Sequence, residues 1–356
     1  MKIHFLLPNS GEIPIGGIMV AYEYANRLVK RGHEVTLYHT PDMSAPFHWR
    51  FAHFLTRLIH LKGTYQPSGW FQISPEVKLK WIPFYHFLFI SSADVIISTY
   101  WQTTEKASVF PQSKGNLYYL VQDYELYRSA SPLLKEQMQQ TFRGKQHNLP
   151  ISPACETMIL ESGGRVFAMQ PNGIDLTLFR LRNPVNALSR NAIGFPFRPE
   201  LFKGTRDAIA ALIEIHREFP HIPIWAFGST KSPDLPNWVH YHFRPDFETL
   251  VTLYNQSMIF VTASHFEGWG LPGLESMACG AALVSTNHGG IAAYAEDGVN
   301  ALLSPIQNPH QLTLQIRKLI LDSSFRFSLV ENALKCISNF DWERSVEKLL
   351  ENISKV

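Results

Sequence analysis

The stretch that decides the fold is residues 264–290, SHFEGWGLPGLESMACGAALVSTNHGG. It follows a short apolar run, 258–262, whose β-branched residues predict a buried parallel strand. Gly268 and Gly270 allow the backbone to come close to a ligand, and Pro272 fits the first turn of a helix. The sequence therefore predicts a strand, a glycine-rich loop and a helix, and the free N–H groups at the start of that helix suit phosphate or sugar oxygens.

Two glutamates flank this surface, Glu267 in the loop and Glu275 in the first part of the helix. A carboxylate that accepts hydrogen bonds from neighbouring hydroxyls can hold a ribose or a hexose, so two of them could hold one of each. Glu275 could equally be an acidic residue that complements the helix dipole, with the glycines as ordinary loop residues. Short glycine-rich loops do not separate these alternatives by themselves.

The whole stretch resembles the donor-binding signature of the retaining glycosyltransferases of family 4, in which two glutamates bracket a glycine-rich turn. The resemblance implies an α/β fold of the GT-B architecture, with two Rossmann-like domains that face each other across a cleft. It also implies that Glu267 lies beside the transferred sugar and that Glu275 binds the ribose of the nucleotide. The loop residues expected to contact the donor are Gly268, Trp269, Gly270 and Leu271.

Composition limits the class of protein. A chain of 356 residues exceeds one ordinary core, so two α/β domains are expected. The formal net charge of +2 argues against a nucleic-acid-binding protein driven by bulk electrostatics. The three cysteines lack the paired spacing of a disulfide framework or a zinc site, which fits a reducing cytoplasm. The apolar runs are too short for a signal peptide or a membrane span, so we expect a cytoplasmic protein, soluble or peripheral at the inner membrane face.

The amino-terminal half begins with a strand, a loop and a helix, and Gly16 and Gly17 stand where the helix starts. A nicotinamide dehydrogenase is the obvious alternative, but this opening loop lacks G-x-G-x-x-G, and the second strand, 34–39, ends at Tyr38-His39-Thr40 without an acidic residue to bind ribose. The two glycines resemble the glycine loop of the glycosyltransferase family, which faces the donor phosphates or the acceptor. They could also be no more than a tight connection between a strand and a helix.

Residues 47–61 combine apolar side chains with basic ones at steps of three and four, which predicts an amphipathic helix. Such a helix usually packs on a core and exposes a solvated basic face. It could also dock on anionic lipid or on a charged acceptor, so peripheral membrane contact through 47–61 is an open alternative.

A second polar cluster, Gln122-Asp123-Tyr124-Glu125, follows an expected strand at 117–121. The ends of parallel strands line ligand sites in open α/β sheets, so an acceptor could bind here. Asp123 could accept a hydrogen bond from an acceptor hydroxyl, or it could only cap the segment that follows. The four residues resemble a subset of the family that includes bacterial rhamnosyltransferases acting on surface polysaccharides.

A turn at 171–175, which contains Asn172 and Gly173, follows a predicted strand at 165–169 and marks a boundary. The turn resembles the domain junction of the family, and the resemblance places Asn172 among the donor-binding residues. The expected domains are an acceptor-binding domain at 1–170, a nucleotide-sugar-binding domain at 171–339, and a terminal helix at 340–356 that packs back on the first domain.

Arg198 and Lys203 precede a helix that Thr205 is expected to cap. Their five-residue offset resembles that of the diphosphate-binding arginine and lysine of the family. Two cations there would neutralise the pyrophosphate as the glycosidic bond breaks. The sequence contains no D-x-D cluster, so we expect no metal ion and no cofactor besides the nucleotide sugar, whose nucleotide could be UDP, GDP or dTDP.

Together these features predict a metal-independent enzyme that moves a hexosyl or deoxyhexosyl unit, with retention of configuration, from a nucleotide sugar to a glycan or lipid-linked glycan. Cell-surface polysaccharide synthesis is the expected setting. Two other classes remain, a nucleotide-sugar epimerase of the same architecture and a non-catalytic nucleotide-sugar-binding subunit. Catalytic roles are expected for Glu267, Arg198, Lys203 and Asp123.

Overall fold

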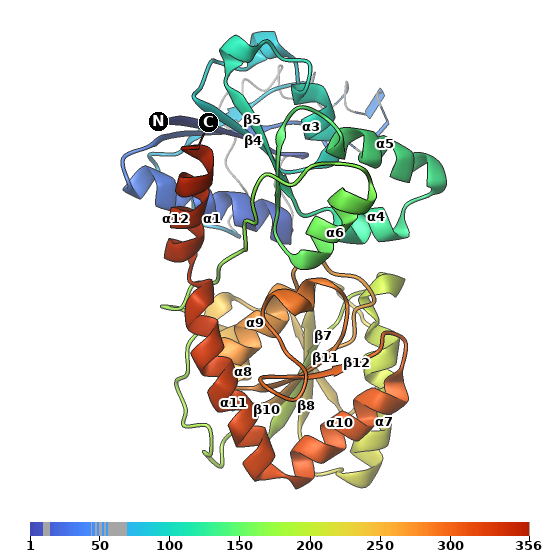
Figure 1. Ribbon diagram of the computed structural model, residues 1–356. Coiled ribbons are helices and arrows are strands. Elements are labelled where there is room, and N and C mark those ends of the chain that lie inside the picture. Colours follow the sequence, from blue (N-terminus) through green and yellow to red (C-terminus); the bar gives the residue numbers. More distant parts are fainter. Residues whose placement is uncertain are drawn as a thin grey trace. The chain divides into compact units, whose positions relative to one another are not determined.

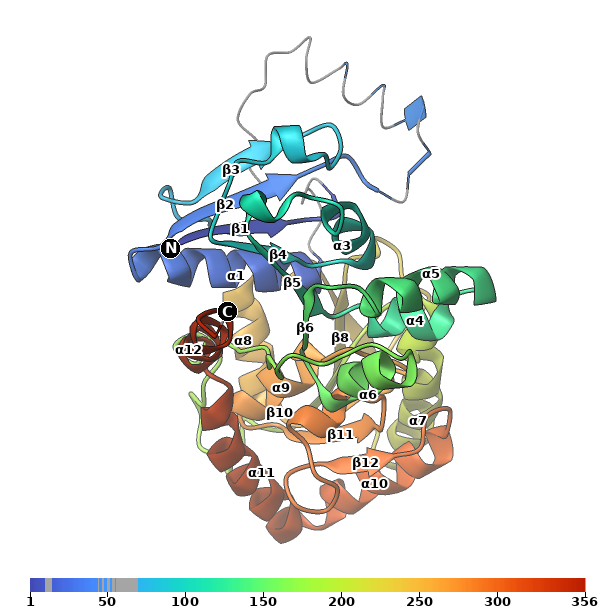
Figure 2. The same ribbon diagram turned by 45° about the horizontal axis from the view of Figure 1, so that its top comes forward.

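The computed structural model describes residues 1–9, 15–43, 45–46, 48–49, 52, 55 and 70–355. Among these residues the chain forms two compact units, each with helices packed along a parallel sheet of six strands (Figures 1 and 2). The predicted α/β fold with two Rossmann-like halves is confirmed. The first unit comprises Met1–Ile151, Cys155–Asn172 and Trp342–Val356, and the second comprises Ser152–Ala154 and Gly173–Asp341.

The sheet of the first unit has the order β3-β2-β1-β4-β5-β6, and every strand pair in it is parallel. Its central strands are almost wholly buried, which explains their continuous apolar runs. The strands are β1 (Lys2–Leu6), β2 (Glu34–His39), β3 (Lys78–Trp81), β4 (Val95–Ser98), β5 (Asn116–Val121) and β6 (His147–Pro150).

The sheet of the second unit repeats this order as β12-β11-β10-β7-β8-β9. In both sheets the strand order reverses beside the first strand, between β1 and β4 in one and between β7 and β10 in the other. Ligands of open α/β sheets bind at the carboxyl ends of the strands at such a point. The strands are β7 (Ala192–Pro196), β8 (Ile224–Gly228), β9 (Val239–Phe243), β10 (Ser257–Thr262), β11 (Ala282–Thr286) and β12 (Leu302–Ser304).

The helices begin where local capping chemistry allows them to. Asp246 accepts the N–H of Thr249 at the start of α8, and Asn308 accepts the N–H of Gln311 at the start of α10. The first unit contains α1 (Gly16–Lys30), α3 (Trp101–Ala107), α4 (Tyr124–Ser129), α5 (Pro132–Phe142), most of α6 (Pro153–Glu161) and α12 (Trp342–Ile353). The second contains α7 (Thr205–Glu218), α8 (Phe247–Gln256), α9 (Leu271–Ala278), α10 (Pro309–Leu321) and α11 (Ser323–Ile337).

The terminal helix α12 packs beside α1 (Figures 1 and 2). The Trp342 ring meets the Tyr24 ring edge-on at a centroid distance of 5.2 Å. The side-chain amide of Gln170 donates to the Tyr24 hydroxyl and to the carbonyl of Ser345, at 2.8 Å in both cases. These contacts hold α12 in the first unit.

The predicted strand at 165–169 is wrong. Within it only Val166 forms a single bridge, to Asn148 on β6, and the segment continues as an irregular chain. The ring of Phe167 packs on the ring of His147 at a centroid distance of 4.4 Å, so side-chain packing holds this segment against the edge strand. The division between the units falls at Asn172 and Gly173, close to the expected boundary.

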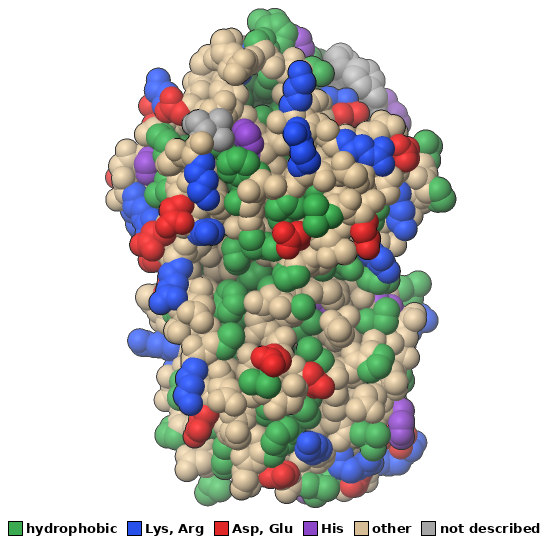
Figure 3. Space-filling view, viewed as in Figure 1, with side chains coloured by type: hydrophobic (Ala, Val, Ile, Leu, Met, Phe, Trp, Pro, Cys, Tyr) green, Lys and Arg blue, Asp and Glu red, His purple; other side chains and the backbone are tan. Residues whose placement is uncertain are grey.

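Most of the predicted amphipathic helix at 47–61 lies outside the described residues, so membrane contact through it stays a prediction. In the described part of the chain, no helix combines the length and the apolar character needed to cross a bilayer. On the face that Figure 3 shows, acidic and basic side chains are interspersed, as the small net charge suggests.

Candidate functional site

The loop after β10 carries Glu267 and is hydrogen-bonded to the loop after β11. The N–H of Glu267 donates to the carbonyl of His288 at 3.1 Å, and the carbonyl of Glu267 accepts the N–H of Gly290 at 3.0 Å. Gly290 has no room for a side chain, because a Cβ there would lie 2.5 Å from the carbonyl carbon of Gly268. Backbone contacts at the carboxyl edge of the sheet therefore fix the main chain at Glu267.

Gly270 begins α9 in a left-handed conformation, with φ of 91°. A Cβ at this position would also lie 3.0 Å from Cε1 of His288, a tight contact that adds to the backbone requirement for glycine. Its carbonyl accepts the hydroxyl of Tyr294 at 2.8 Å, and Pro272 stands in the first turn, as predicted. The expected sequence of strand, loop and helix is thus present.

Arg198 follows β7, and Thr205 holds its main chain. The N–H of Arg198 donates to the Thr205 hydroxyl at 3.0 Å, and that hydroxyl donates to the Arg198 carbonyl at 2.6 Å. The guanidinium lies over the ring of Phe227, 5.3 Å from its centroid. The predicted capping role of Thr205 is wrong, because α7 is preceded by Gly204, which has φ of 62° and approaches the carbonyl of Ala263 too closely for any Cβ.

Lys203 and Glu267 form an ion pair, with 2.9 Å between Nζ and Oε2. The hydroxyl of Ser264 donates to the other carboxylate oxygen, Oε1, at 2.8 Å. Lys203 ends the short 3₁₀ helix Leu201–Lys203, and Glu267 lies in the loop after β10, so adjacent strands bring them together. The sequence nominated both residues but did not predict that they contact each other.

Glu275 is buried in α9, and the hydroxyl of Tyr254 donates to its Oε2 at 3.0 Å. Burial raises the pKa of Glu275 to about 7, against the lowering effects of the Tyr254 hydrogen bond and of the charge on Arg198. The carboxyl therefore titrates near neutrality, and it belongs to the same electrostatic environment as Arg198.

His288 is a further residue of this site that the sequence reasoning missed. Its side chain is buried, its ring lies against Gly270, and in the part of the chain that the structure describes its Nδ1 has no hydrogen-bond partner. Burial lowers the pKa of His288 to about 4, although the nearby charge of Glu267 acts in the opposite direction. The imidazole is therefore neutral at physiological pH. The polar His-Gly-Gly sequence directly after β11 was a signal that could have found it.

Trp269 and Leu271 differ in exposure although both were expected to contact the donor. The Trp269 side chain is 3% exposed and packs between the rings of Tyr294 and Phe340, at centroid distances of 5.7 and 5.8 Å. Leu271 is only partly buried. Because the indole is enclosed in the core, the main chain of Trp269 is the part that could meet a ligand.

In the first unit, Asp123 lies just after β5 and is almost fully buried. The N–H of Trp101 donates to its Oδ2 at 2.8 Å, and the hydroxyl of Tyr119 donates to the same oxygen. Burial raises the pKa of Asp123 to about 7. Its side chain does not cap α4, so that alternative is wrong; it binds the first residue of α3 instead.

Gly16 and Gly17 begin α1, and the side chain of Gln122 lies against Gly17. The side-chain amide of Gln122 donates to the carbonyls of Gly17 and Thr99, at 3.2 and 3.1 Å. A Cβ on Gly17 would lie 2.8 Å from that amide nitrogen, so a side chain at this position would require the Gln122 amide to move. Asn172, which ends the segment Cys155–Asn172 of the first unit, is buried, and among the described residues its Oδ1 has no hydrogen-bond partner.

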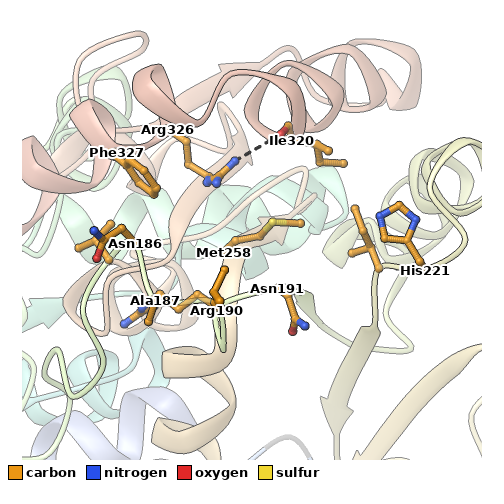
Figure 4. Close-up of a pocket in the computed structure, with 12 residues that line it drawn as sticks. Asn186, Ala187, Arg190, Asn191, His221, Met258, Ile320, Arg326 and Phe327 are labelled. Atoms are coloured by element: carbon orange, nitrogen blue, oxygen red, sulfur yellow. Dashed lines mark hydrogen bonds between the residues drawn. The ribbon is translucent and has the colours of Figure 1, made fainter.

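A pocket of about 410 Å³ lies elsewhere in the second unit (Figure 4). Its lining includes Ile222 and Met258 from the amino ends of strands, whereas Glu267 lies at the carboxyl ends. Arg190 and Arg326 border the pocket, but their guanidinium groups donate to main-chain carbonyls, as the dashed line to Ile320 shows for Arg326. None of the predicted site residues lines it.

Residues 229–335 match the family described as Glycosyl transferases group 1. An uncharacterized glycosyltransferase of Methanocaldococcus jannaschii is 32% identical over 114 residues, which cover 31% of this chain and 32% of that protein. The D-inositol 3-phosphate glycosyltransferase of Acidothermus cellulolyticus is 34% identical over 103 residues, which cover 29% of this chain and 23% of that protein. The similarity thus spans 32% and 23% of the length of these two relatives.

Solved structures match nearly the whole chain. Sucrose-phosphate synthase from Thermosynechococcus elongatus superposes with a TM-score of 0.78 at 16% identity, over 99% of this chain and 98% of that one. HepE of Anabaena, solved in complex with UDP and glucose, superposes with a TM-score of 0.73 at 18% identity over 100% of both chains. Such low identities establish the fold alone. The chain therefore has the GT-B fold of glycosyltransferases, and its segment similar to the Glycosyl transferases group 1 family contains the loop with Glu267 and Glu275.

Proposed function

We propose that this protein is a glycosyltransferase that takes a hexosyl or deoxyhexosyl unit from a nucleotide sugar. The observation that carries the proposal is the ion pair between Lys203 and Glu267 at the switch point of the second sheet. Arg198 follows β7, the strand that also precedes Lys203, and Glu275 lies in α9, the helix after the loop that carries Glu267. Two cations suit a diphosphate, and two carboxylates suit the hydroxyls of a ribose and a hexose.

The nucleotide is expected to lie along the carboxyl ends of β7, β8 and β9. Arg244, which follows β9, has φ of 45°, a left-handed conformation that is uncommon outside glycine and is found more often at functional sites. Phe243 beside it is 42% exposed, and the Arg244 guanidinium lies 5.3 Å from the centroid of its ring. A flat, partly exposed aromatic surface there supports stacking of a nucleobase.

The chemistry follows from the charges. As the anomeric bond breaks, its electron pair goes to the diphosphate, and Arg198 and Lys203 stabilise the charge that grows there. Glu267 faces the positive charge that develops on the anomeric carbon. We infer that the sugar is transferred with retention of configuration and that these cations and the start of α9 take the place of a divalent ion.

Asp123 is the proposed acceptor-side residue. Both of its hydrogen bonds, from Trp101 and Tyr119, end on Oδ2, so Oδ1 is the oxygen that could accept a hydroxyl of the acceptor. The proposed acceptor is a glycan or a lipid-linked glycan of cell-surface polysaccharide synthesis. This part of the proposal rests on the resemblance of the Gln-Asp-Tyr-Glu cluster to rhamnosyltransferase-like members of the family.

A donor screen tests the proposal. Thermal unfolding is measured with UDP-, GDP- and dTDP-sugars, because a ligand at 100 times its dissociation constant adds about 2.7 kcal/mol of stability. One nucleotide series is expected to raise the melting temperature, and the purified protein is then expected to glycosylate a glycan acceptor. Absence of any shift with all three series would refute nucleotide-sugar binding, and binding without product would indicate a non-catalytic binding subunit.

A further inference from the structure

The two oxygens of the Glu267 carboxylate have different partners. Oε1 accepts the hydroxyl of Ser264, whereas Oε2 faces the ammonium of Lys203. Lys203 is also the residue that the proposed function assigns to the donor diphosphate. One lysine would therefore serve two anions, which raises the question of what holds Glu267 when the diphosphate binds.

We propose that Ser264 is a positioning residue. It keeps Glu267 oriented while the Lys203 ammonium group exchanges its ion pair with Glu267 for one with the diphosphate of the donor. This inference rests on the proposed function. With Oε1 still held by the Ser264 hydroxyl, Oε2 is freed to accept a hydroxyl of the transferred sugar. Binding of the diphosphate and orientation of the carboxylate are thus coupled through Lys203.

The position of Ser264 suits this role because its main chain is held on two sides. Its carbonyl accepts the hydroxyl of Thr286, which ends β11. The N–H of the next residue, His265, donates to the carbonyl of Phe202 at 2.7 Å. Ser264 itself is 6% exposed. Its hydroxyl is therefore presented to Glu267 from a rigid part of the loop.

The transfer of Lys203 follows from charge. A diphosphate carries more negative charge than a single carboxylate and offers several acceptor oxygens, so it competes well for an ammonium group. A glutamate side chain that is held less firmly regains rotamers and spends less time in the reactive geometry. The hydrogen bond from Ser264 prevents that loss of order.

Steady-state kinetics of Ser264→Ala test the positioning role. Because a hydrogen bond to a charged group is removed, kcat is expected to fall about tenfold, while donor KM and nucleoside diphosphate affinity stay unchanged. Ser264→Thr keeps the hydroxyl and is expected to restore kcat. The matched control is Ser276→Ala in α9, where the hydroxyl only donates to the carbonyl of Gly273, and its kcat should equal that of the unchanged protein.

A binding measurement tests the transfer of Lys203 without relying on turnover. Glu267→Gln removes the charge that competes for the ammonium, so the variant is expected to bind the nucleoside diphosphate more tightly than the unchanged protein does. Equal or weaker binding by Glu267→Gln would overturn the exchange, and an unchanged kcat in Ser264→Ala would overturn the positioning role. If the unchanged protein neither binds a nucleotide sugar nor transfers from it, the proposed function itself fails and this inference fails with it.

Discussion

Asp123 in the first unit and Glu275 in the second both have a pKa that burial raises, but their surroundings differ. Each is buried, each accepts a tyrosine hydroxyl, and burial raises the pKa of each to about 7. Asp123 also accepts the N–H of Trp101 at the start of α3, whereas Glu275 is influenced by the charge of Arg198. A raised pKa therefore does not by itself identify a ligand-binding carboxyl. The groups around each carboxyl, the Trp101 N–H in one case and the Arg198 charge in the other, distinguish the two roles.

This comparison assigns Asp123 a role in the framework of the first unit in addition to any role in the acceptor site. It assigns Glu275 to the cationic donor site. The two carboxyls should behave alike when the protein is titrated and differently when a nucleotide binds. The predictions below test both halves of this statement.

The largest expected effect is on the pH dependence of stability. A folded-state pKa raised above that of the unfolded chain stabilises the protein below the unfolded value and loses this contribution as pH rises through the folded value. For Asp123 the window runs from its ordinary pKa of 3.8 to about 7, which corresponds to on the order of 4 kcal/mol. For Glu275 it runs from 4.5 to about 7.

Urea unfolding measured between pH 4 and pH 8 should therefore show a fall in stability contributed by these two carboxyls as pH rises, which the lowered pKa values of the buried His4 and His288 oppose. Asp123→Asn and Glu275→Gln keep a neutral polar group, so each should remove part of that fall. If only one variant changes the dependence of unfolding free energy on pH, the two carboxyls do not both have a raised pKa.

A second, smaller effect concerns the cationic part of the donor site. Lys203→Ala should weaken nucleoside diphosphate binding by about 1.5–3 kcal/mol, because a charge-assisted contact is lost. Calorimetry gives the affinity, and an unchanged melting temperature shows that the fold is intact. Lys318→Ala, at the exposed end of α10, is the matched control and should bind normally. Equal affinities for the two variants would contradict the assignment of Lys203.

A third test separates the two carboxyls by their ligands. The proposed contact of Glu275 with the ribose is similar in the ground and transition states, so Glu275→Gln should raise donor KM by about tenfold with little change in kcat. Asp123→Asn should leave donor KM and diphosphate affinity as they are. A rise of donor KM in Asp123→Asn with none in Glu275→Gln would reverse the comparison.

The smallest expected effect is that of metal removal. Because Arg198, Lys203 and the start of α9 are proposed to stabilise the leaving diphosphate, excess EDTA should change kcat by less than about twofold. Loss of activity that magnesium or manganese restores would show that a divalent ion performs this task.

Much of the second unit could be predicted from the sequence, because its signals are local. The apolar run before Ser264, the glycine at 270 and the proline at 272 predict β10, the loop and α9 from neighbouring residues alone. The offset of Arg198 and Lys203 needed only the resemblance to a known family. Where the signal was weaker, at 165–169, a short apolar segment was mistaken for a strand, because sequence shows apolar character but not whether a strand edge is available.

By itself the sequence determined the alternating strands and helices, the glycine-rich loop and the identity of the charged candidates. Only the tertiary structure decided that Lys203 contacts Glu267, that Thr205 holds Arg198 and that His288 lies against Gly270. The contacts of Lys203 with Glu267 and of His288 with Gly270 join the ends of different strands, whereas Thr205 and Arg198 both follow β7. The strand order of a parallel sheet places such ends side by side, and that order follows from how the helical crossovers pack over the whole sheet rather than from residues near each contact.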